Sequence, residues 1–154
     1  IPSNTISIQS EDLHYQVARI YADLNEKESM REIMEILISR KSGKPVNKVE
    51  YANTFYQELG DIDRAINILE DMRAEFLEIE TILNVKGFDK KFISRRKWNQ
   101  WKKAYPEIVN SLVYIYRKND KLLDAEIVLS DWVMRNPEDT NAKEILKQIR
   151  SGEQ

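Results

Sequence analysis

The side chains that most often perform catalysis are scarce in this sequence. His14 is the only histidine among 154 residues, and cysteine is absent. Multi-histidine metal sites, thiolate ligands and thiol nucleophiles are therefore excluded, and a Ser-His-Asp site is not expected. His14 lies near the start of the first expected helix, where we expect a structural or surface role.

Other patterns that could do chemistry are incomplete. The dipeptide at Gly43 lacks the earlier glycine and the following serine or threonine of a phosphate-binding loop. The acidic pairs Glu26/Glu28 and Asp61/Asp63 lie in turns and first helical turns, where capping and the helix dipole explain them. They do not continue into a calcium loop. We therefore expect no catalytic residue, metal, cofactor or enzymatic activity in this segment, and infer no small-molecule substrate.

The strongest charge feature is a basic, aromatic segment between residues 84 and 105. From residue 86 to residue 103, eight basic residues accompany one acid, so the segment carries +7 and the rest carries −9 of a net charge of −2. The candidate basic aromatic patch consists of Lys90, Lys91, Phe92, Arg95, Arg96, Lys97, Trp98, Trp101 and Lys102.

Three interpretations of this segment are open. In the first, the aromatic residues pack against the other helices and the basic residues face water or acidic helices. In the second, Lys and Arg contact an anionic membrane or an acidic protein partner while Trp and Phe insert or pack. In the third, the phosphates and stacked bases of a nucleic acid occupy the same positions, which makes nucleic acid the least favoured partner.

The elements that hold these residues are expected to be helices. Four glycines and four prolines argue against a turn-rich β fold, and apolar residues recur with helical spacing from residue 11 onward. Residues 1–10 are expected to be an extended lead-in, and Pro106 is expected to begin a helix. No run of about 18 apolar residues could span a bilayer. The expected apolar face of the first helix comprises Leu13, Val17, Ile20, Tyr21 and Leu24.

One hairpin pattern occurs three times. A tyrosine is followed by a polar turn and, nine residues on, by a small or medium apolar residue. The three tyrosines are Tyr21, Tyr56 and Tyr116; the turn residues are Asn25, Gly60 and Asp120; the apolar residues are Met30, Ala65 and Ala125. Gly, Asn and Asp best tolerate a left-handed backbone. The tyrosines are separated by 35 and then 60 residues, so the basic segment interrupts the period.

The pattern resembles the tetratricopeptide repeat (TPR), a unit of about 34 residues whose two antiparallel helices stack into a solenoid. The small residue lets the helices approach, and the tyrosine packs into the hairpin. The early Trp and the Leu-Gly pair of the family are missing, and the closing proline is present only as Pro137. A weaker similarity links the chain to soluble C-terminal tails of bacterial multi-pass membrane proteins.

The resemblance implies an all-α, TPR-like α-solenoid of about three helical hairpins plus a C-terminal capping helix. The hairpins are expected at about 11–41, 46–82 and 106–136, with a helical or irregular insertion at 84–105 and the capping helix at 139–150. Residues 11–150 are expected to form a single domain.

TPR solenoids bind partners in a concave groove lined by the first helix of each hairpin. Transfer of these positions gives a candidate groove of Tyr15, Arg19, Ala22, Asn47, Glu50, Tyr51, Thr54, Gln57, Asn110, Tyr114 and Arg117. Its mixed polar and aromatic character suits an extended peptide. The family's Lys/Asn/Arg clamp for a terminal carboxylate is not reproduced, and Glu50 would oppose it.

The sequence thus predicts a non-catalytic protein–protein interaction module that binds a peptide or a partner domain in this groove. The start of the chain lacks Met and a signal-peptide pattern, from which we expect a fragment of a larger protein. The alternative is an accessory soluble domain of a membrane-associated enzyme, such as a bacterial multi-pass membrane transferase, whose basic aromatic insertion contacts an anionic membrane or an acidic partner. The lack of cysteine and the basic insertion slightly favour the cytoplasm.

Overall fold

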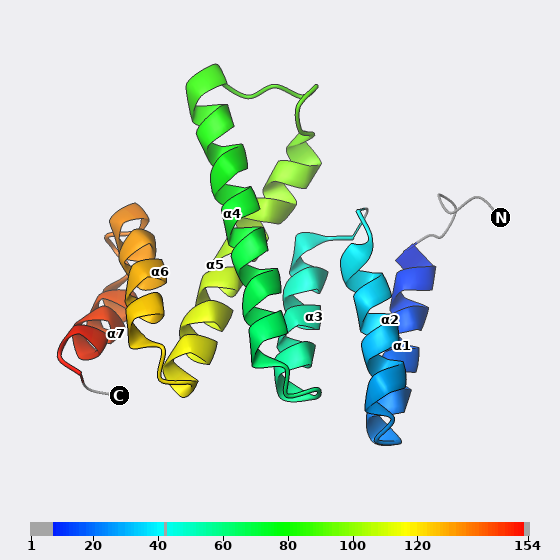
Figure 1. Cartoon of the computed structure of the whole chain (residues 1–154). Coiled ribbons are helices and arrows are strands. Elements are labelled where there is room, and N and C mark those ends of the chain that lie inside the picture. Colours follow the sequence, from blue (N-terminus) through cyan, green and yellow to red (C-terminus); the bar gives the residue numbers. More distant parts are fainter. Residues whose placement is uncertain (1–7, 42, 153–154) are drawn as a thin grey trace. The chain divides into compact units, whose positions relative to one another are not determined.

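The structure, a computed structural model, is entirely helical in the residues that it describes, 8–41 and 43–152 (Figure 1). Side chains are described for 11–41 and 43–152. The seven helices in these ranges are α1 (Ile8–Asp23), α2 (Lys27–Ser39), α3 (Pro45–Gln57), α4 (Ile62–Lys86), α5 (Arg95–Lys118), α6 (Leu122–Arg135) and α7 (Thr140–Arg150). The all-α prediction is therefore confirmed.

The chain divides into two compact units, Ile1–Ala65 and Ile66–Gln154. The first contains α1, α2, α3 and the first turn of α4, and the second contains the rest of α4 and α5 to α7. Helix α1 begins at Ile8, so the expected extended lead-in is wrong for residues 8–10, and residues 1–7 lie outside the described part of the chain. Each unit is described by itself below.

Three turns repeat the same local geometry, as the sequence pattern predicts. Asn25, Gly60 and Asp120 all have positive φ, of 57°, 63° and 58°. The first and third turns close in the same way, since Glu26 N–H donates to the Tyr21 carbonyl and Lys121 N–H donates to the Tyr116 carbonyl, both at 2.8 Å. This bond satisfies a carbonyl that the helix end would leave unpaired. The apolar residues that follow the turns are all buried, namely Met30, Ala65 and Ala125.

The core of the first unit surrounds Phe55 on α3. Its ring is fully buried, and the guanidinium carbons of Arg31 and Arg64 lie 5.9 and 5.8 Å from its centroid. Each arginine is held by a carboxylate, Arg31 by Asp61 at 2.6 Å and Arg64 by Glu35 at 2.8 Å. The aliphatic residues buried with Phe55 are Ala18, Met30, Met34, Leu37, Val49, Ala52, Leu59 and Ala65.

The expected apolar face of α1 is only partly correct. Leu13, Ile20 and Leu24 are exposed, by 61, 56 and 64 %, whereas Ala18 is fully buried. Helix α1 packs on α2 and presents its Ala18 side to the core of the first unit. The three exposed residues lie on the opposite face of the helix. Apolar periodicity alone could not show which side would be covered.

In the second unit, the stretch at 84–105 lengthens two helices. Helix α4 continues to Lys86, a loop spans 87–94, and α5 begins at Arg95 and passes through Pro106 without a break. Figure 1 shows the two helices joined by this loop at the top of the view. The expected helix start at Pro106 is therefore wrong. The hydroxyl of Ser94 accepts from the Lys97 N–H at 3.1 Å and caps the helix earlier.

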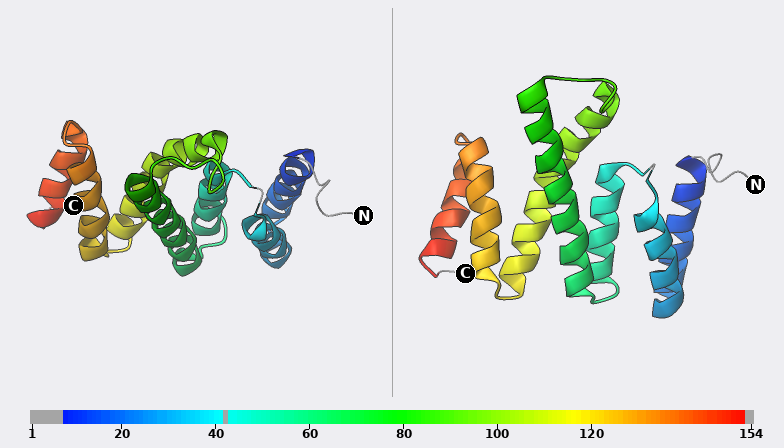
Figure 2. Two further views of the ribbon diagram at one scale, coloured as in Figure 1. Left: turned by 90° about the horizontal axis from the view of Figure 1, so that it is seen from above. Right: turned by 45° about the horizontal axis from the view of Figure 1, so that its top comes forward.

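Burial of aromatic side chains offsets the unfavourable position of the proline. A proline in a helix interior costs about 3 kcal/mol, because it removes one hydrogen bond and crowds the preceding turn. The early part of α5 buries Trp98, Trp101 and Tyr105. The Phe76 ring on α4 stacks on Trp98 and Tyr105, with centroids 5.3 and 4.0 Å apart. Helix α6 then packs between α5 and α7 (Figure 2).

Candidate functional site

A polar cluster joins α1 to α3 within the first unit and contains four of the eleven candidate groove residues. The hydroxyl of Tyr51 donates to Glu11 Oε1 at 2.7 Å, and Asn47 Nδ2 donates to the same oxygen at 3.5 Å. The Tyr15 hydroxyl lies 3.2 Å from Thr54 Oγ1, and the Tyr15 and Tyr51 rings are 5.2 Å apart. Both Tyr51 and Thr54 are buried, so these side chains hold α1 against α3.

Other candidate groove residues face solvent. Glu50 and Gln57 on α3 are exposed, and Arg19 on α1 pairs with Glu58 at 2.9 Å. In the second unit, Asn110 and Tyr114 are exposed on α5, and Lys118 Nζ lies 5.8 Å from the Tyr114 centroid. A binding role for these residues stays a prediction. Arg19, Ala22 and Arg117 are half-buried.

The candidate basic aromatic patch separates into three groups in the second unit. Trp98 and Trp101 are buried in the core, as the first interpretation expects for them. Lys97 and Lys102 line pockets that are described below. The remaining members stay exposed at the α4–α5 end, namely Lys90, Lys91, Phe92, Arg95 and Arg96.

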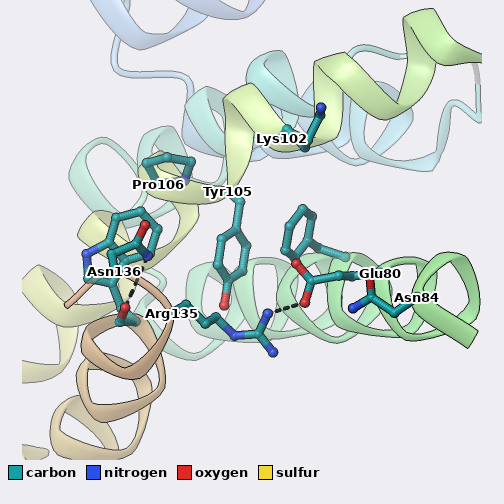
Figure 3. Close-up of a pocket in the computed structure, with 9 residues that line it drawn as sticks. Glu80, Asn84, Lys102, Tyr105, Pro106, Arg135 and Asn136 are labelled. Atoms are coloured by element: carbon teal, nitrogen blue, oxygen red, sulfur yellow. Dashed lines mark hydrogen bonds and ion pairs between the residues drawn. The ribbon is translucent and has the colours of Figure 1, made fainter. Parts of the chain in front are cut away.

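One pocket of the second unit, here called the Tyr105 pocket, has a volume of about 470 Å³. Its lining combines aromatic residues with polar and charged ones (Figure 3). Arg135 at the end of α6 forms an ion pair with Glu80 on α4, and Tyr105 lies over this pair in the view. The residues that line the pocket are Phe76, Glu80, Asn84, Lys102, Tyr105, Pro106, Trp132, Arg135 and Asn136.

Pro106 leaves one backbone carbonyl of α5 without its usual helical donor. Proline has no N–H, so the Lys102 carbonyl cannot receive the usual hydrogen bond from the residue four positions later. Lys102 and Pro106 both line the pocket. A carbonyl that lacks its helical donor can accept a hydrogen bond from another group. The lining also includes Asn84, whose amide group can donate and accept.

Burial also changes the acidity of Tyr105. Desolvation, reinforced by the negative charge of Asp131, raises the pKa of Tyr105 to about 12 from 10.0. Its hydroxyl donates to Asp131 Oδ2 at 3.2 Å, and Arg135 Nε donates to the same oxygen at 2.9 Å. Burial likewise raises the pKa of Tyr51 and of Tyr116, whose hydroxyls donate to Glu11 and Glu70. All three tyrosines are neutral donors at neutral pH.

Tyr105 should make the second unit sensitive to alkali. Because its folded pKa is raised, its stabilising contribution is complete below pH 10.0 and is lost as the pH rises through about 12. The Tyr105→Phe variant should show a shallower fall of unfolding free energy over this range. Urea unfolding followed by tryptophan fluorescence measures the difference. Equal slopes in the two proteins would contradict the assignment.

A smaller pocket of about 340 Å³ lies between α4, the 87–94 loop and the start of α5. Its inner wall is apolar and includes Ile79 and Trp101, and Phe92 lies half exposed at its edge. Glu75, Glu78 and Lys97 supply the charged part of the lining, which Ile82 and Ile93 complete.

His14 has a structural contact. Its Nδ1 lies 3.0 Å from Nη2 of Arg40. A guanidinium can only donate, so Nδ1 accepts and the neutral ring carries its proton on Nε2. Among residues 8–41 and 43–152, no cluster of three or more His, Cys, Asp or Glu is arranged to hold a metal ion. No helix in these ranges is both long and apolar enough to cross a membrane.

Comparison with known proteins adds no assignment. The chain matched no family model, no curated protein and no solved structure. The two pockets and the exposed surfaces are therefore the features from which a function can be proposed. Sequence reasoning missed most of the Tyr105 pocket, including Glu80, Asn84, Arg135 and Asn136. These residues are about 50 positions apart on α4 and α6, and no local pattern joins them.

Proposed function

We propose that this chain is a non-catalytic, TPR-like protein-interaction module, with about three hairpins and α7 as the capping helix. The repeated left-handed turns and buried apolar positions support the repeat assignment. The proposed binding site is the Tyr105 pocket, which receives an extended segment of a partner protein. The observation that carries this proposal is that one pocket lining combines three aromatic residues with side chains that donate and accept hydrogen bonds.

The chemistry of the pocket fits a peptide. Of the three aromatic residues in the lining, the half-buried Trp132 offers ring surface to an apolar or aromatic side chain, whereas Phe76 and Tyr105, each 4 % exposed, contribute little surface. The Lys102 carbonyl accepts a peptide N–H, and the Asn84 amide bonds a peptide carbonyl or N–H. The pocket volume of about 470 Å³ is within the range of sites that hold one or two side chains.

Selection from a phage-displayed library of short random peptides tests the proposal. We expect enriched peptides to bind the purified chain in fluorescence anisotropy, and Asn84→Ala to weaken binding about fivefold by removing one hydrogen bond. Asn99→Ala is the matched control, because Asn99 is also an exposed helical asparagine of the second unit but does not line the pocket. It should bind as the unmodified chain does.

A second variant separates binding from folding. Pro106→Ala restores the N–H that the Lys102 carbonyl lacks, so it should stabilise α5. The same change should weaken peptide binding, because the carbonyl would then be occupied within the helix. Failure to enrich any peptide, or equal binding by the Asn84→Ala and Asn99→Ala variants, would remove the Tyr105 pocket as the site.

A further inference from the structure

The α4–α5 end presents a surface that the Tyr105 pocket does not use. Five basic residues lie there: Lys86 in the last turn of α4, Lys90 and Lys91 in the loop, and Arg95 and Arg96 in the first turn of α5. All five side chains are exposed, and none forms an ion pair with a carboxylate among the residues that the structure describes. We call these residues, together with the apolar ones below, the hairpin-end surface.

Apolar side chains lie among these cations. Val85 is 78 % exposed, Phe92 is 47 % exposed and Phe88 is 38 % exposed. Val85 lies in the last turn of α4, and Phe88 and Phe92 lie in the loop that also carries Lys90 and Lys91. Trp98 and Trp101 are buried in the core of the second unit, whereas these three side chains are not. The surface therefore joins unpaired positive charge to apolar groups that no part of their own unit covers fully.

From this combination we propose that the hairpin-end surface docks on an anionic lipid bilayer, an activity beyond the peptide binding proposed above. Lipid phosphates meet Lys86, Lys90, Lys91, Arg95 and Arg96, while Val85 and Phe92 enter the boundary between headgroups and acyl chains. A bilayer has an apolar interior that can receive Val85 and Phe92, whereas a simple polyanion offers only negative charge. Each basic residue at an anionic surface contributes about fivefold to partitioning, so five act together effectively even though each is weak.

The structure favours a bilayer over a nucleic acid. Stacking of bases requires open ring faces, but Arg95 already covers Phe88, with its guanidinium carbon 3.7 Å from the ring centroid. The two tryptophans of the segment are buried at 9 and 5 % exposure and offer no platform.

Sedimentation with vesicles tests the proposal. The unmodified chain should bind vesicles that contain phosphatidylglycerol, should not bind pure phosphatidylcholine, and should release as salt rises. The Arg95→Glu/Arg96→Glu variant should lower the partition coefficient roughly tenfold or more. Its folding should not suffer, because acids in the first turn of α5 are favourable to the helix dipole. A melting curve for the variant separates lost binding from unfolding.

The matched control is Lys121→Glu/Lys143→Glu. It makes the same change in net charge at exposed positions near the starts of α6 and α7, so it should keep vesicle binding. Val85→Ser/Phe92→Ser should bind phosphatidylglycerol vesicles more weakly at low salt and should release at a lower salt concentration than the unmodified chain. A Phe92→Trp variant should show a blue shift of emission on phosphatidylglycerol vesicles.

Four results would overturn the proposal. They are no binding to phosphatidylglycerol vesicles, equal loss in the control variant, no effect of Val85→Ser/Phe92→Ser, and preferential binding of polyglutamate or a single-stranded oligonucleotide. The vesicle experiment does not involve Asn84, and the peptide experiment does not involve the hairpin-end surface. Either proposal can therefore fail while the other stands.

Discussion

Replacement of Phe76 by alanine should destabilise the second unit by about 3–5 kcal/mol. Phe76 is 4 % exposed, and its ring stacks on both Trp98 and Tyr105. Its removal deletes a large buried side chain, leaves a cavity, and abolishes two aromatic contacts that contribute about 0.5–1.5 kcal/mol each beyond area burial. The same stack holds the first half of α5 against α4, so both the Tyr105 pocket and the hairpin-end surface depend on it.

Tryptophan fluorescence in a urea titration measures this effect directly. The three tryptophans of the chain, at 98, 101 and 132, all belong to the second unit. Phe92→Ala is the control, because the same substitution at a side chain that is about half exposed should cost about 1 kcal/mol or less. If the two variants unfold at the same urea concentration, the stack does not support the second unit.

The Ala125→Leu variant should also be destabilised, by about 1–3 kcal/mol. Ala125 is fully buried on α6, which packs on both α5 and α7. It occupies the position that the TPR resemblance assigns to a small residue. Extra methylene groups there force α6 away from its neighbours or push side chains out of their preferred rotamers.

Ala74→Leu provides the matched comparison. Ala74 is exposed on α4, so the same substitution meets solvent and should change the unfolding free energy by about 0.5 kcal/mol or less. Differential scanning calorimetry of both variants gives the contrast. If Ala125→Leu does not lower the unfolding free energy, the TPR-like packing is contradicted, because the close approach of the helices would then not require a small residue at this position.

The parts of the fold that sequence predicted well are governed by neighbouring residues. The turn residues Asn25, Gly60 and Asp120 were expected to accept a left-handed backbone, and all three do. The apolar position that follows each turn was expected to be inside the hairpin, and it is buried each time. Both properties depend on residues within a few positions of one another, so a short sequence window contains the necessary information.

Features that depend on competition between distant groups were not predicted. Proline at position 106 favours a helix start on local grounds, but the Ser94 cap and the burial of Trp98 and Trp101 outweigh that preference. The groove residues Tyr51 and Thr54 could be placed on α3 from periodicity. Their burial depended on α1 lying across them, with Glu11 about 40 positions away as the partner of Tyr51.

The candidate sites show the same division between local features, which the sequence predicts, and features that depend on distant residues, which it does not. The exposed basic residues of the patch could be found from composition, because long charged side chains rarely become fully buried. The sequence could not show which aromatic residues would lie beside them on the surface. Val85, outside the sequence-derived patch, is the most exposed of the three apolar residues at that end, whereas Trp98 and Trp101 belong to the core. The Tyr105 pocket requires α4, α5 and α6 to be placed together, which no local pattern encodes.

The three left-handed turns have a kinetic consequence. Each turn brings together residues that are close in the chain, so the first contacts of every hairpin close short loops at small entropic cost. A fold dominated by such local contacts has low contact order, which in small helical proteins accompanies folding in microseconds to milliseconds. Since a left-handed residue occurs in three turns, we expect folding to begin at more than one of them, so that a mutation that slows one turn leaves another start available.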